Sequence, residues 1–157
     1  HLAYLKDFYR DNLLAKPGGI SVLGTPIDLT LIRTPAYVQA GNEDHIAPAV
    51  SVWKLTRQLR GDVRFVLAGS GHIAGVINPP AANKYMYWTL PDGVPLPETL
   101  DAFRAAAVET PGSWWPDWIR WLAPRAGVRV PARIPGSHPG FPALDDAPGP
   151  YVKERIA

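Results

Sequence analysis

The chain reads Gly41-Asn42-Glu43-Asp44-His45-Ile46-Ala47-Pro48 at one point and Gly69-Ser70-Gly71-His72 at another, and these two stretches decide the fold. Each stretch follows a short apolar run, residues 36–40 in the first case and 63–68 in the second. Runs of this length predict buried strands. Segment 48–60 begins with a proline, which suits the first turn of a helix, and carries apolar residues at helical spacing. A strand, a helix and a strand in this order predict a right-handed unit with two parallel strands.

The helix predicted over 48–60 has one apolar side and one charged side. We expect the apolar side to face the core and the charged side to face water, up to a stop at Gly61-Asp62. The apolar positions are Val52, Leu55 and Leu59, and the charged positions are Lys54, Arg57 and Arg60.

Asp44 and His72 follow the two predicted strands and lie 28 residues apart. Loops that leave parallel strands meet at one edge of a sheet, where ligand sites form. A histidine that acts as a general base needs a carboxylate on its second nitrogen, and α/β-hydrolases carry nucleophile, acid and histidine in that order. An aspartate alone would more readily be a cap, but the pair at this spacing predicts the acid and base of a triad. Ile73 and His45 are expected beside the substrate. For His45, a residue that merely fills its loop is an equal alternative.

The nucleophile of such a triad is expected upstream. The chain has no cysteine, and its 43 residues before Asp44 contain no Gly-x-Ser-x-Gly elbow. Ser70 is no replacement, because the elbow would need glycine where the chain has Ala68 and His72. We therefore expect the C-terminal portion of an α/β-hydrolase fold, made of its last parallel strands and helices. Upstream sequence or a partner chain would have to complete so small a sheet.

The remaining segments predict helices and an irregular tail. Residues 2–15 and 98–109 carry apolar residues at helical spacing. Four tryptophans between positions 114 and 121 are expected to pack a helix against the body rather than to form a platform that stacks sugars. Residues 124–157 contain seven prolines and no apolar periodicity. We therefore expect a body over 1–123 and a proline-rich tail over 124–157.

The composition argues against several classes of protein. The 157 residues are 46% hydrophobic and 19% charged, which predicts one folded core, and no apolar run of 18 residues could span a membrane. A net charge of +2 gives no argument for a nucleic-acid partner. No metal site is predicted, because the chain lacks cysteine and shows no ligand spacing of histidines and carboxylates.

Several motifs are more specific than a general hydrolase pattern. They are Gly24-Thr25-Pro26-Ile27-Asp28-Leu29, residues 43–48, Arg64-Phe65-Val66-Leu67, residues 69–80, Tyr87-Trp88-Thr89, Gly112-Ser113-Trp114-Trp115-Pro116-Asp117-Trp118 and Ala147-Pro148-Gly149-Pro150-Tyr151-Val152. With these motifs, nearly the whole chain resembles the C-terminal catalytic region of the polyhydroxyalkanoate synthases, most closely those of class I.

This resemblance implies an acyltransferase of the α/β-hydrolase fold that polymerises (R)-3-hydroxyacyl-CoA, with 3-hydroxybutyryl-CoA as the expected monomer, and releases CoA. The family's triad is Cys, Asp and His, and Asp44 and His72 match the last two. No cofactor is implied, because the CoA thioester is the substrate. The implied partners are the upstream part of the same enzyme, a second copy in a homodimer, and the growing polyester on a cytoplasmic granule rather than a membrane.

Two other functions stay open on the sequence alone. A serine elbow upstream would make the enzyme an esterase or depolymerase of the same fold. Taken literally, the 157 residues without a nucleophile would be an inactive fragment or an assembly module. All of these readings predict that the chain by itself is inactive.

Overall fold

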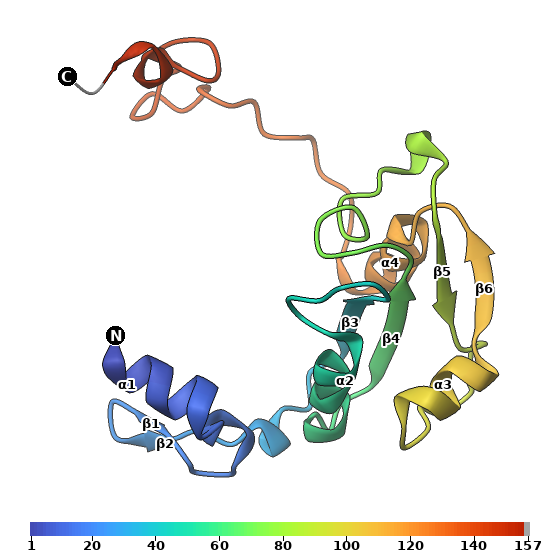
Figure 1. Ribbon diagram of the computed structural model, residues 1–157. Helices are drawn as coiled ribbons and strands as arrows, with labels where there is room; N and C mark the ends of the chain where they lie inside the picture. Colours follow the sequence, from blue (N-terminus) through green and yellow to red (C-terminus); the bar gives the residue numbers. More distant parts are fainter. Residues whose placement is uncertain (156–157) are drawn as a thin grey trace. The chain divides into compact units, whose positions relative to one another are not determined.

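A four-stranded sheet with the strand order β3-β4-β5-β6 positions the candidate site (Figure 1). The computed structural model describes residues 1–155. β3 (Ala36–Gly41) and β4 (Val63–Ala68) run parallel, paired from Ala36 opposite Val63 to Gly41 opposite Ala68. α2 (Ala49–Gln58) connects them. The predicted strand–helix–strand unit is therefore confirmed, and the second strand has the predicted bounds.

The other half of the sheet was not predicted. β5 (Met86–Thr89) and β6 (Val108–Pro111) extend it with antiparallel pairs, β5 on β4 and β6 on β5. The helix expected over 98–109 is shorter, because α3 (Leu100–Ala106) ends before extended residues that join β6. Two corrections follow. The strands of this chain are not all parallel, and the chain itself supplies two of the strands that were expected from upstream sequence or a partner.

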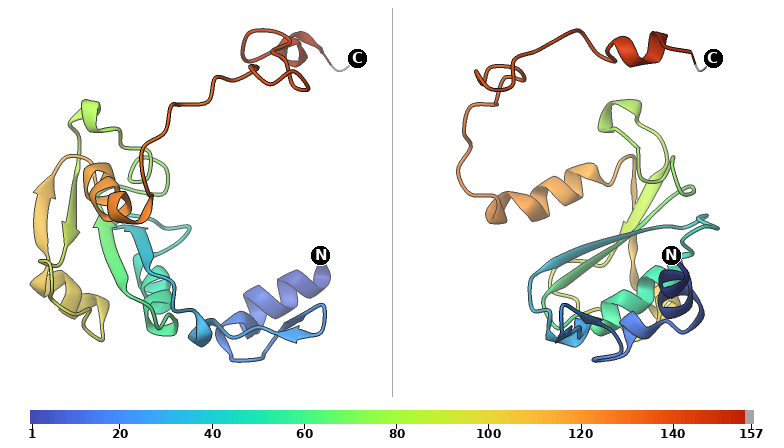
Figure 2. Two further views of the ribbon diagram at one scale, coloured as in Figure 1. Left: turned by 180° about the vertical axis from the view of Figure 1, so that it is seen from behind. Right: turned by 90° about the vertical axis from the view of Figure 1, so that its left-hand side faces the viewer.

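Two helices cover opposite faces of the β3–β4 pair (Figures 1 and 2). Alternate residues of a strand point to opposite faces. Phe65 therefore meets Trp53 of α2 on one face, at 4.8 Å between ring centroids, whereas its neighbour Arg64 bonds α4 (Trp115–Leu122) on the other. The main core lies on the α2 face. Its buried residues are Val38, Ala40, Ala49, Trp53, Phe65, Leu67, Leu90, Leu100 and Phe103.

The inward side of α2 is only partly as predicted: Val52 and Leu59 pack against the core as expected, and Leu55 does not. The buried positions are Ala49, Trp53 and Thr56, whereas Leu55 is 40% exposed. The large ring of Trp53 packs between Phe65 and Phe103 and so sets which side of the helix faces the sheet.

The N-terminal segment is not the single helix predicted over 2–15. α1 (Leu2–Tyr4) continues as a π-helix over Leu5–Arg10 and stops where Asn12 adopts the left-handed conformation with φ +46°. A 3₁₀ turn over Leu13–Ala15 and a short hairpin follow. The hairpin consists of β1 (Ser21–Val22) and β2 (Thr25–Pro26).

Residues from Pro124 onward form a second unit. Apart from 3₁₀ turns at Ala123–Arg125 and Pro150–Lys153, its described residues form no helix or strand. No helix in the described part of the chain is long and apolar enough to cross a membrane.

Candidate active site

Asp44 and His72 meet where β3 and β4 end. Gly41 and Ala68 close the parallel register, so the loops that follow leave the sheet side by side. Backbone hydrogen bonds continue between these loops, from Asn42 N to Ala68 O at 2.8 Å and from Glu43 N to Ser70 O at 3.1 Å. His72 Nδ1 then lies 2.8 Å from Asp44 Oδ2. The structure therefore brings together the two residues that the sequence singled out.

The glycine at position 41 leaves room for this approach. A Cβ atom there would lie 3.1 Å from the Cβ of Asp44 and 3.2 Å from the carbonyl oxygen of Ser70. A larger residue would therefore make tight contacts with both loops, and one of these neighbours would have to shift by a few tenths of an ångström. Gly41 therefore allows the loops of the acid and the base to lie close together.

The carboxylate of Asp44 is oriented by its own loop. Its Oδ1 accepts hydrogen bonds from the backbone N–H groups of Ile46 at 2.9 Å and Ala47 at 2.8 Å, which leaves Oδ2 for His72. The amide of Ala47 lowers the pKa of Asp44, and the bonds from His72 and Ile46 add to this effect against the opposing effect of desolvation. The group is therefore an ionised acceptor with a fixed direction.

This acceptor determines the tautomer of His72. An ionised carboxylate can only accept, so the proton of the shared hydrogen bond sits on His72 Nδ1. The neutral ring then has a lone pair on Nε2, and the side chain is 46% exposed while that of Asp44 is 6% exposed. The arrangement can take a proton at Nε2 and stabilise the resulting imidazolium.

The segment after His72 folds into a tight turn. The N–H of Gly75 bonds the carbonyl of Gly71 at 3.0 Å, and the N–H groups of Val76 and Ile77 bond the carbonyl of Ile73. A Cβ at Gly75 would lie 2.8 Å from Gly71 O and 2.9 Å from Gly69 O, both backbone atoms. Only glycine fits there without moving the loop.

The two other predicted site residues lie on the surface. His45 follows Asp44 directly, and Ile73 follows His72 and is 69% exposed. Both flank the Asp44–His72 pair along the chain, and their role beside a substrate stays a prediction. No group of three or more histidine, cysteine, aspartate or glutamate side chains among the described residues could hold a metal ion.

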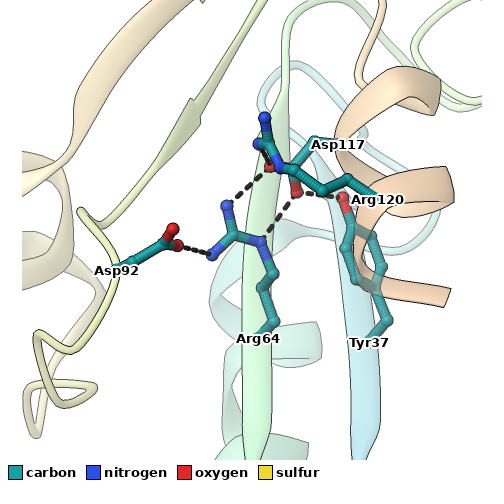
Figure 3. A network of polar contacts seen from close by, with 5 residues as sticks. All are labelled: Tyr37, Arg64, Asp92, Asp117 and Arg120. Atoms are coloured by element: carbon teal, nitrogen blue, oxygen red, sulfur yellow. Dashed lines mark hydrogen bonds and ion pairs between the residues drawn. The ribbon is translucent and has the colours of Figure 1, made fainter. Parts of the chain in front are cut away.

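Sequence reasoning missed a buried carboxylate on the other face of the sheet (Figure 3). Asp117 of α4 is 1% exposed and accepts two bonds from Arg64 of β4, at 2.6 and 2.7 Å. Tyr37 of β3 donates to it at 2.9 Å, and Arg120 donates from the next turn of α4. Asp92 completes the group by accepting from Arg64 at 3.2 Å. We call these five residues the Asp117 network.

The charges of the Asp117 network are matched. Burial alone raises the pKa of Asp117, but hydrogen bonds from Arg64 and Tyr37 and the charge of Arg64 outweigh it, so the pKa is lowered. Burial raises the pKa of Tyr37, and the neighbouring Asp117 charge raises it further. At neutral pH, the ionised carboxylate of Asp117 thus faces the guanidinium of Arg64 and the neutral hydroxyl of Tyr37.

Curated relatives match nearly the whole chain. It is 48% identical over 157 residues to the poly(3-hydroxyalkanoate) polymerase of Methylorubrum extorquens, an alignment that covers 99% of this chain and 25% of the relative. It is 45% identical over 152 residues to the polymerase subunit PhaC of Cupriavidus necator, and this alignment covers 97% of this chain and 25% of the relative. Poly(3-hydroxyalkanoate) polymerase 1 of Ectopseudomonas oleovorans is 35% identical over 153 residues, which are 96% of this chain and 26% of the relative.

No protein-family model matches the chain. The similarity to the polymerases nevertheless runs through both stretches that hold the pair, because it covers 96–99% of the chain. The chain therefore belongs to the poly(3-hydroxyalkanoate) polymerase family, and it spans about a quarter of the length of the relatives that it matches.

Proposed function

We propose that this chain is the C-terminal part of a polymerase that joins (R)-3-hydroxyacyl units from CoA thioesters into polyester, with 3-hydroxybutyryl-CoA as the expected monomer. In this proposal the chain belongs to an α/β-hydrolase fold and supplies the acid, Asp44, and the base, His72. A cysteine nucleophile lies upstream. The observation that carries the proposal is the contact of 2.8 Å between Asp44 Oδ2 and His72 Nδ1 at the carboxyl ends of two parallel strands.

In the first half of the reaction, Nε2 of His72 takes the proton of the cysteine thiol. The thiolate attacks the thioester carbonyl and forms an acyl-enzyme. The bond from the carbonyl carbon to the CoA sulfur breaks, and this sulfur takes the proton from His72, so that CoA leaves as a thiol. Asp44 remains ionised throughout and stabilises the imidazolium. No cofactor or metal is needed, since the energy of the thioester drives the transfer.

In the second half, the same nitrogen takes a proton from the hydroxyl of the next unit or of the chain end. That oxygen attacks the acyl-enzyme carbonyl, an ester bond forms, and the cysteine sulfur leaves.

The test uses the complete polymerase that contains this chain and follows CoA release. His72→Ala should lower the rate on the order of 10³–10⁴-fold, and Asp44→Asn should lower it somewhat less, because His72 carries the proton whereas Asp44 holds its tautomer. Glu43→Gln, which removes the adjacent exposed carboxylate, is the matched control and should change the rate little.

Two results would contradict the proposal. A wild-type rate in the Asp44→Asn variant would mean that another carboxylate orients the histidine. CoA release by residues 1–157 alone, abolished by Ser70→Ala, would mean that the chain holds its own nucleophile. We further propose, from the resemblance to the family alone, a homodimer that acts at a polyester granule in the cytoplasm, which sedimentation and granule fractionation would test.

A further inference from the structure

We propose that Trp114 and Trp115 are positioning residues for His72, because their indole N–H groups hold the backbone carbonyls three and four residues after the histidine. The inference rests on the proposed function, in which His72 is the base. It assigns these tryptophans more than the packing role that the sequence predicted for their segment.

Two indole hydrogen bonds join the histidine loop to the start of α4. Trp114 Nε1 donates to the carbonyl of Gly75 at 2.9 Å, and Trp115 Nε1 donates to the carbonyl of Val76 at 3.0 Å. Both acceptors belong to the tight turn that follows His72, and each pair lies 39 residues apart in the sequence. The two bonds therefore fix the far side of the turn to another element of the fold.

Apart from these bonds, the His72 loop is held at its start, where the N–H of Gly69 donates to the carbonyl of Met86 at 2.8 Å, and on its aspartate side. On that side, Ser70 accepts from Glu43, and His72 itself bonds Asp44. The loop contains three glycines within seven residues, 69, 71 and 75, so its backbone has wide conformational freedom of its own. A catalytic side chain on such a loop needs support after the histidine as well as before it to stay within about 0.5 Å of its productive position.

The tryptophans are themselves fixed to the strands that lead to the pair. The ring of Trp114 stacks on Tyr37 of β3, with 6.0 Å between centroids and 26° between planes. Tyr37 donates to Asp117 of α4, which also binds Arg64 of β4 (Figure 3). β3 leads to Asp44 and β4 leads to His72, so one helix ties both strands and the histidine loop together.

The alternative is that the tryptophans only seal the fold. Trp114 and Trp115 are half-buried in this chain, and each makes a directed hydrogen bond to the turn that follows His72. The two indoles with a direct bond to the histidine loop are the two nearest the start of α4. A packed indole N–H usually finds an acceptor, but here both acceptors belong to one turn, the one that follows His72, so both bonds act on the position of the histidine.

The experiment compares Trp114→Phe, Trp115→Phe and the double variant in the complete polymerase. Phenylalanine keeps an aromatic ring and lacks the N–H. Trp53→Phe is the matched control, since it also removes an indole-to-carbonyl bond, to Glu98 O at 3.3 Å, but on the opposite face of the sheet. At position 115, benzothienylalanine is a second variant that keeps the bicyclic shape without the N–H, for use if phenylalanine prevents folding.

We expect each single variant to lower kcat about 10-fold and the double variant to lower it about 100-fold, the loss associated with a displacement of roughly 1 Å at a catalytic group. KM should stay unchanged, because the bonds orient the base rather than bind the substrate. Trp53→Phe should lower the melting temperature and leave kcat within about twofold, because its lost bond does not reach the loop.

The outcomes separate this inference from the proposed function. If His72→Ala and Asp44→Asn lose turnover while the double tryptophan variant and the benzothienylalanine variant keep it, the positioning role is refuted and the proposed function stands. If His72→Ala keeps turnover, the proposed function fails, and this inference fails with it. A fall in kcat that the Trp53→Phe control shows to the same degree would also refute it, since general loss of stability would then explain the effect.

Discussion

Replacing Asp117 by alanine should destabilise the protein more than its position on a surface helix suggests. The carboxylate is 1% exposed and accepts bonds from Arg64, Tyr37 and Arg120. In the alanine variant, the Arg64 guanidinium would keep one carboxylate partner of the network, Asp92, and the side chain of Asp92 is 92% exposed. The substitution would also leave the Tyr37 hydroxyl, which is partly buried, without its acceptor.

The magnitude follows from these contacts. Removing one partner of a buried ion pair costs about 3–5 kcal/mol. Arg64 is 19% exposed and keeps Asp92 at 3.2 Å, so the lower end of that range, about 3 kcal/mol, applies to the pair. The stranded Tyr37 hydroxyl adds about 1 kcal/mol. We expect Asp117→Ala to lower the free energy of unfolding by about 4 kcal/mol in all.

Equilibrium urea unfolding measures this change, provided that the slope of the transition is the same in both proteins. The combined variant Arg64→Met with Asp117→Leu is the informative comparison, because an apolar pair of similar size recovers much of the loss when a buried ion pair is replaced as a whole. A loss below about 1 kcal/mol in Asp117→Ala, or no recovery in the combined variant, would refute the reasoning.

Two further predictions concern the loop and acid stability. Gly75→Ala should reduce CoA release sharply while the protein stays folded, because the new Cβ would meet two backbone oxygens at 2.8 and 2.9 Å and displace the His72 loop; circular dichroism and turnover measured together check this. Because the pKa of Asp117 is lowered in the folded state, its contribution to stability is present above about pH 4 and is lost as the pH falls through that lowered value. The urea midpoint of Asp117→Asn should therefore fall less steeply below pH 4 than that of the wild type.

The sequence predicted the parallel half of the fold because its signals are local. Residues 63–68 are an apolar run between Gly61-Asp62 and a glycine, and the strand has these bounds. Once two parallel strands are placed, topology determines where their following loops meet, so the approach of Asp44 and His72 could be predicted without any side-chain detail.

The antiparallel half gave weaker signals. β5 and β6 have four residues each, and β6 ends in Pro111 and contains Glu109 and Thr110. Such a short edge strand shows little alternation, and Val108 extended the apolar spacing of the preceding helix. The period of the pattern could not show where the helix stops and the strand begins.

The Asp117 network was missed because it joins residues far apart in the sequence. Arg64 and Asp117 are 53 positions apart, and Tyr37 and Asp117 are 80 apart. One signal was available: Arg64 is a single charge within a strand that is otherwise apolar, and a charge in a buried strand requires a partner. The partner itself could not be chosen from several candidate carboxylates, because the choice depends on which helix covers that face.

The two faces of the β3–β4 pair therefore contribute different things to the site. On the α2 face, Phe65 and its neighbours pack an apolar core, which stabilises but does not impose direction. On the α4 face, Arg64 and Tyr37 make bonds with defined geometry to Asp117. Directional bonds fix how far α4 sits along the strands, and so where its indoles reach the His72 loop. The ion pair of Arg64 and Asp117 thus contributes geometry more than stability, since replacing a buried ion pair as a whole by apolar residues costs little stability.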